Sequence, residues 1–152
     1  METFDSAKAA RVWQRVRGEE EEPNRQQGLL QLISEEQSDA TQYLVLSRQF
    51  RGKQTSLLQK MHEKARASAA ALRGIYYLLT GEHPASTVLP PHQRNREAVL
   101  RRCYVGSVRR LGEYEARSAD PEYGCVYAKL AADTQEQCFR ILILLGKEPS
   151  EN

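Results

Sequence analysis

Apolar residues recur at alternating spacings of three and four along four stretches of the chain. This is the period of an amphipathic α-helix, and segments that alternate residue by residue, as strands do, are absent. The alternation keeps one seam of each helix towards a common core. The positions expected to face inward are Leu29, Ile33, Glu36, Ala40, Tyr43, Ser47 and Phe50, then Leu58, Met61, Ala65, Ser68, Leu72, Ile75 and Leu79, then Leu100, Tyr104, Ser107, Leu111 and Tyr114, and last Tyr127, Leu130, Thr134, Gln137, Ile141 and Leu144. The sequence therefore predicts an all-α protein built from four long helices.

Glycine and proline mark the ends of these helices. The breaks fall near Glu22-Pro23-Asn24, Gly52, Gly81 to Pro91, Asp120-Pro121 and Gly146 to Pro149. Gly52 allows a tight turn, and Asp120-Pro121 predicts an N-cap followed by proline at the first position of the last helix. Short links make flanking helices antiparallel neighbours, whereas the proline-rich link is long enough to run the length of the bundle. We expect residues 25–148 to form an antiparallel four-helix bundle with one long crossover.

Residues 1–24 form a separate segment in this prediction. Ala9, Val12, Trp13 and Val16 share one stripe of a short amphipathic helix, which an acidic linker, Glu19–Glu22, joins to the bundle. We expect the apolar side of this helix to dock on the bundle. A helix that binds a partner or a membrane surface is the alternative.

The two halves of the predicted bundle resemble each other. A shift of 71 positions aligns Leu29 with Leu100, Glu36 with Ser107 and Tyr43 with Tyr114. A shift of 69 positions aligns Met61 with Leu130, Ala65 with Thr134, Ser68 with Gln137 and Leu72 with Ile141. The alignment indicates a repeated helical hairpin with approximate two-fold internal symmetry.

Composition agrees with one globular domain. The chain has 152 residues, of which 40% are hydrophobic and 28% are charged, and this length suits a single core. The longest apolar run, Ile141–Leu145, is far shorter than the roughly 20 residues that span a bilayer. Because the N-terminus also lacks the layout of a secretory signal, we expect a cytoplasmic protein that does not insert into membranes.

Charge does not point to nucleic acid. The net charge is only +2, although arginines cluster at Arg94/Arg96, Arg101/Arg102 and Arg109/Arg110. A domain that binds nucleic acid usually carries a clearer excess of positive charge. We therefore expect these arginines to lie on a solvated helix face, and a basic nucleic-acid face is the alternative.

Cysteine, histidine and tyrosine add no recognisable catalytic motif. The three cysteines, Cys103, Cys125 and Cys138, include no CxxC pair, which argues against a disulfide framework and a zinc site. Cys103 and Cys138 fall at or near inward faces, where cysteine behaves as a small apolar residue. His83 and His92 lie in the proline-rich link and are expected to be solvated. The remaining tyrosines are read as packing or interface residues: Tyr76, Tyr77, Tyr104, Tyr123 and Tyr127.

A polar layer interrupts the middle of every inward stripe. Buried polar groups cost free energy unless each finds a partner, so matched polar positions on four helices call for a binding site or a hydrogen-bond network. The layer consists of Glu36, Ser68, Ser107, Thr134 and Gln137.

At this point the sequence resembles a known family. Leu32–Tyr43 and Leu72–Gly81 are similar to the first hairpin of rubrerythrin-related, ferritin-like proteins, and Val12–Val16 resembles a segment that precedes the bundle in some bacterial members. Tyr114, Asp120-Pro121 and Leu130–Asp133 carry a weaker likeness in the second half. The resemblance implies a ferritin-like bundle over nearly the whole chain.

The same resemblance identifies where a dinuclear metal site would lie. Members of this family bind two iron or manganese ions with a carboxylate from each of two helices, seven residues before a tyrosine, and a Glu-x-x-His pair from each of the other two. Glu36 and Tyr43 match the first carboxylate and its tyrosine. The remaining positions carry Ser107 with Tyr114, Ala65 with Ser68, and Thr134 with Gln137, so one of six ligands is left.

One carboxylate cannot balance two divalent ions, so we expect no bound metal and no cofactor. Helical geometry turns His62, Glu63 and Glu136 away from the inward stripe, and a shifted single-metal site that uses them is the alternative. Glu36 can accept a hydrogen bond from Ser107, Thr134 or Gln137, or can itself be protonated. Because burial without a nearby cation raises its pKa, we expect a protonated or water-bridged Glu36. A catalytic acid at Glu36 is the sharper alternative.

The loss of five ligand positions on a retained scaffold leads to a functional expectation. We expect a non-catalytic interaction or assembly module, and a homodimer because bundles of this family commonly pair. One alternative is an iron- or manganese-dependent oxidoreductase, handling peroxide or iron at a rearranged site near Glu36. The other is a small-molecule binder that uses the vacated core pocket. The sequence names neither a protein partner nor a ligand.

Overall fold

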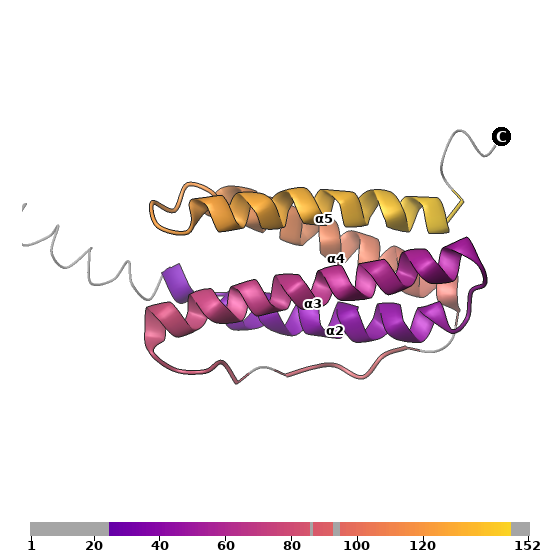
Figure 1. Ribbon diagram of the computed structural model, residues 1–152, viewed down its shortest axis with the longest axis horizontal. Helices are drawn as coiled ribbons and strands as arrows, with labels where there is room; N and C mark the ends of the chain where they lie inside the picture. Colours follow the sequence, from indigo (N-terminus) through magenta and orange to yellow (C-terminus); the bar gives the residue numbers. More distant parts are fainter. Residues whose placement is uncertain (1–24, 86, 93–94, 147–152) are drawn as a thin grey trace, which may run out of the picture.

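The computed structural model describes residues 25–85, 87–92 and 95–146, and this part of the chain is all-helical, with four helices and no strand (Figure 1). The helices are α2 (Leu29–Ser47), α3 (Lys53–Thr80), α4 (Arg96–Arg117) and α5 (Gly124–Leu144). The prediction of an all-α protein with four long helices is confirmed. The predicted N-terminal helix and acidic linker lie outside the described residues. Within the described ranges, none of the helices combines the length and apolarity that a membrane crossing requires.

The predicted inward stripes are the buried faces of these helices. Every stripe position of α2 and α5 is buried, including Phe50, which lies just beyond the end of α2. On α3 only Leu79 is partly exposed, and on α4 Tyr104 and Leu111 are partly exposed. Cys103 and Cys138 are buried as expected, while Cys125 is exposed.

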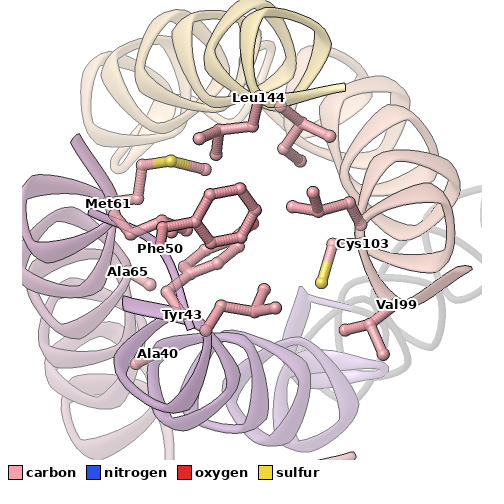
Figure 2. Close-up of a cluster of buried hydrophobic side chains, with 12 residues drawn as sticks. Ala40, Tyr43, Phe50, Met61, Ala65, Val99, Cys103 and Leu144 are labelled. Carbon is pink, nitrogen blue, oxygen red and sulfur yellow. The ribbon is translucent and has the colours of Figure 1, made fainter. Parts of the chain in front are cut away.

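The core consists of two apolar clusters with the polar layer between them. One cluster gathers Tyr43, Phe50, Met61, Cys103 and Leu144 from the four helices and the turn after α2, and Figure 2 shows their side chains pointing into one central space. The other lies towards the opposite end of each helix and includes Leu29, Leu32, Ile33, Leu72, Ile75, Tyr114, Tyr127, Leu130 and Ala131. Along all four helices the polar positions fall between the residues of the two clusters. The polar layer is therefore central in the molecule.

The predicted turn at Gly52 is present, but the start of the last helix differs from the prediction. Gly52 has φ 61° and ψ −128°, a conformation that only glycine adopts at low cost, and α3 begins at the next residue.

The last helix, α5, begins at Gly124 and not at Pro121. The carboxylate of Asp120 accepts hydrogen bonds from the backbone N–H of Glu122 and of Tyr123 at 2.8 and 2.9 Å. Asp120 therefore closes a separate turn, which an ion pair with Arg25 at 3.0 Å also holds.

The link between α3 and α4 runs alongside α2. Its backbone N–H groups at Thr87 and Leu89 donate to the hydroxyls of Ser34 and Ser38 at 3.0 and 2.9 Å. Further along, the amide of Gln42 donates to the backbone carbonyl of His92 at 2.7 Å and accepts from its N–H at 2.8 Å. The side chains of His83 and His92 are exposed, as predicted.

Candidate functional site

Glu36 lies in the polar layer and is held by groups from α4. Its side chain is only 6% exposed. The hydroxyl of Tyr114 donates to Glu36 Oε2 at 2.6 Å, and Arg110 Nε lies 3.4 Å from the same oxygen. The carboxylate is therefore paired with a cation and a phenol inside the bundle.

Arg110 is the centre of this site. Its side chain is 5% exposed and also pairs with Asp39 Oδ2, while its Nη1 lies 3.4 Å from Glu35 Oε1. Its Nη2 further donates to the hydroxyl of Ser107 at 3.4 Å. The prediction that this arginine lies on a solvated face is wrong. Arg110 follows Ser107 by three residues and precedes Tyr114 by four, so helical spacing places it on the inward stripe.

Asp39 is a second acidic residue that the inward pattern missed. It follows Glu36 by three residues, and its side chain is 17% exposed. Burial raises its pKa, and the charge and hydrogen bond of Arg110 oppose that rise. The same spacing of three that places Arg110 next to Ser107 could have identified Asp39 beside Glu36.

The charges of the site influence one another. Burial raises the pKa of Glu36, although the charge of Arg110 and the hydrogen bond from Tyr114 act against it. This direction agrees with the prediction, but the premise that no cation lies nearby is wrong. Burial alone would lower the pKa of Arg110, yet the carboxylates of Asp39 and Glu36 outweigh burial and raise it. Arg110 is therefore a permanent buried cation.

The other substituted ligand positions bond elsewhere. Thr134 donates its hydroxyl to the carbonyl of Leu130 at 2.7 Å. Gln137 donates to the carbonyl of Met61 at 3.1 Å and accepts from Arg140 at 3.2 Å. The predicted bonds from Ser107, Thr134 and Gln137 to Glu36 are replaced by the bond from Tyr114. Ala65 and Ser68 are buried, at 1% and 5% exposure.

The proposed substitutes for the lost ligands also have other partners. His62 Nδ1 lies 2.7 Å from the carbonyl of Ala40. Glu63 and Glu136 form pairs on their own helices, with Arg66 at 3.9 Å and Arg140 at 3.3 Å. Among the residues that the structure describes, no three or more His, Cys, Asp or Glu side chains form a group that could hold a metal ion. Because a guanidinium lies against Glu36, the residues at these positions do not fit a pair of metal ions.

The internal repeat is visible in the site. Tyr114, which the repeat aligns with Tyr43, bonds to Glu36. Burial raises the pKa of Tyr43 well above its usual value, and a hydrogen bond with Ser107, the residue aligned with Glu36, acts against that rise. Each tyrosine therefore faces the polar residue of the other half, as two-fold symmetry requires.

No family model, curated protein or solved structure matches this chain. The class of protein follows from its own geometry. Over the described ranges the chain is all-helical, with four packed helices and a buried arginine–carboxylate cluster between two apolar clusters.

Proposed function

We propose that the chain is a ferritin-like, rubrerythrin-related antiparallel four-helix bundle that no longer binds paired metal ions and acts as a non-catalytic interaction or assembly module. The observation that carries this proposal is the position of Arg110. A buried cation contacts Glu36 of the polar layer and Asp39, which follows Glu36 by three residues on α2. These acids then need no metal to offset their charge.

Electrostatics explains why arginine and metal exclude each other here. Arg110 Nε is 3.4 Å from the one retained ligand oxygen of Glu36. Two divalent ions at this layer would face a buried guanidinium at close range, and like charges at short separation in a dry interior repel strongly. The guanidinium supplies five N–H donors in one plane, which suits several carboxylates at once.

Elemental analysis tests this part of the proposal. The protein would be purified from cells grown with added iron and manganese and measured by mass spectrometry of the metals. We expect far less than one ion per chain. Two equivalents of iron or manganese per chain would overturn the proposal and favour the alternative, a peroxide- or iron-handling oxidoreductase.

Exposed apolar side chains on α4 and α5 support a role in assembly. Val105 and Phe139 are 67% and 61% exposed, and Val108 and Ile143 follow them at helical spacings of three and four. α4 and α5 pack against each other, so the two stripes lie on neighbouring helices. Apolar stripes of this kind are typical of a protein–protein interface, and we propose that they join two copies of the chain.

Light scattering coupled to size exclusion tests the assembly. The native chain is expected to elute as a dimer, and the double variant V105S/F139S as a monomer. Leu78→Ser is the matched control, because Leu78 is equally exposed at 68% but lies on α3. A native monomer would remove the assembly role, whereas a dimer that V105S/F139S leaves intact would refute the α4–α5 interface.

A small-molecule binder is the second candidate. Ser68, one of the substituted ligand positions, lines a cavity of about 330 Å³ between α3 and α5 together with Ala71, Val126 and Leu130. This volume lies within the range of known ligand sites. A crystal structure with ligand density beside Ser68 would favour this candidate over assembly alone.

A further inference from the structure

A second cavity lies outside the polar layer, between α2, α3 and the link that joins α3 to α4. Its volume is about 360 Å³, within the range of small-molecule sites. Val88 of the link and Ala40 of α2 form part of its wall, and Ala69 and Ala70 of α3 form another part. Figure 1 shows this link passing alongside the α2–α3 pair. We name this cavity the α2–α3 groove.

Three basic side chains of α3 line the groove. They are His62, Arg66 and Arg73, and none of the described residues that line the groove carries a carboxylate. Positions four and seven residues apart fall on one face of a helix, so the three side chains follow a single stripe. The acid that pairs with Arg66 is Glu63, at 3.9 Å, and both side chains are about two-thirds exposed or more. Such a surface pair is weak, and the groove keeps a net positive charge.

The ring of His62 has a fixed orientation in this groove. Its Nδ1 lies 2.7 Å from the carbonyl oxygen of Ala40. A carbonyl only accepts, so Nδ1 carries the hydrogen and donates it. With Nδ1 as the donor to Ala40, Nε2 donates to an anion in the imidazolium form of the ring, and the bond holds the ring as one wall of the cavity.

The spacing of the basic groups indicates the shape of the ligand. His62 and Arg66 are about 6 Å apart along the helix axis, whereas Arg66 and Arg73 are about 10 Å apart. One phosphate fits between the first two, but it is too small to reach Arg73 as well. The alanines between Arg66 and Arg73 form an apolar floor, and a guanidinium stacks well on a flat ring.

We propose that the α2–α3 groove binds a phosphate monoester that carries a planar ring, as a mononucleotide does. The phosphate lies between His62 and Arg66, and the ring lies on the alanine floor towards Arg73. None of the lining residues belongs to the polar layer or to the group that Arg110 forms with Glu36 and Asp39. Nucleotide binding in the groove therefore does not depend on the proposed loss of metal binding in the core. Either proposal can fail without the other.

Calorimetric titration of the full chain with adenosine monophosphate tests the proposal, with adenosine and inorganic phosphate as separate probes. The nucleotide should bind at least about tenfold more tightly than either part, because charged hydrogen bonds and ring contacts both contribute. The variant R66Q/R73Q should lose about tenfold or more in affinity, and His62→Gln should lose several-fold. The matched control R51Q/R101Q removes two exposed arginines outside the groove and should change affinity less than twofold.

Three outcomes would overturn the proposal. The first is the absence of nucleotide binding at millimolar concentration. The second is equal affinity for adenosine and its monophosphate, which would exclude a phosphate site. The third is an equal loss in R66Q/R73Q and R51Q/R101Q, which would indicate nonspecific attraction by surface charge. Circular dichroism melts of each variant establish that the fold is retained.

Discussion

Replacing Arg110 with methionine is the most direct perturbation of the buried layer. Methionine keeps much of the length of the side chain but removes its charge and its donors. Glu36 and Asp39 then remain in the core, at 6% and 17% side-chain exposure, without a cation. Removing one partner of a buried ion pair costs about 3–5 kcal/mol. We expect Arg110→Met to lose that much free energy of unfolding near neutral pH.

The loss should depend on pH in a defined direction. Burial raises the pKa of both Glu36 and Asp39, and Arg110 holds that rise back. Without Arg110 both pKa values rise further. An acid with a raised pKa in the folded state binds protons better when folded, so stability is present at low pH and falls as pH rises through that pKa. The cost of Arg110→Met should therefore be smaller at pH 5 than at pH 8.

Urea unfolding followed by circular dichroism at pH 5 and pH 8 measures both effects. Arg109→Met is the matched control, because Arg109 is half-exposed and pairs with Glu35. We expect it to cost about 1 kcal/mol or less. The variant R110M/E36Q/D39N removes these three charges and should recover much of the stability, because none of the three is then left buried without its partner.

Two results would refute this reasoning. One is an equal loss of stability in Arg110→Met and Arg109→Met. The other is a loss that does not change between pH 5 and pH 8 and that the triple variant does not recover. If Arg110→Met does not fold at pH 8, the stability of the triple variant at pH 8 still shows whether the loss comes from unpaired buried charge or from lost packing of the arginine side chain.

Three further predictions concern single side chains. Tyr114→Phe removes the donor to Glu36 and should cost about 1–3 kcal/mol in urea unfolding; a loss below 0.5 kcal/mol would contradict the role of this bond. Glu36→Gln keeps an acceptor for Tyr114 without a titrating group, so its stability should fall less than that of the native chain between pH 5 and pH 8; parallel pH profiles would contradict the raised pKa of Glu36. Gln42→Ala removes both bonds to His92 and should speed limited proteolysis of the link between α3 and α4, whereas an unchanged cleavage rate would show that other contacts hold it.

Helical periodicity alone was enough to predict the four helices and most of their buried faces. An apolar side chain has one favourable place, the interior, and a spacing of three and four assigns that place without knowledge of the partner helix. Glycine at Gly52 and the prolines after Gly81 likewise act locally through the backbone. The polar layer was also predicted, because polar residues interrupt otherwise apolar stripes at matching positions.

The tertiary structure decided what that layer does. Arg110 was assigned to solvent because a charged side chain is costly to bury by itself, and its partners Glu36 and Asp39 lie more than 70 positions away in the sequence. Burial of an arginine is favourable only when carboxylates from another helix reach it at the same height. The turn before α5 combines local and distant contacts, since the backbone N–H groups of Glu122 and Tyr123 and the side chain of Arg25 all donate to the carboxylate of Asp120. Periodicity describes each helix separately, whereas charge pairing depends on which helices meet and at what height.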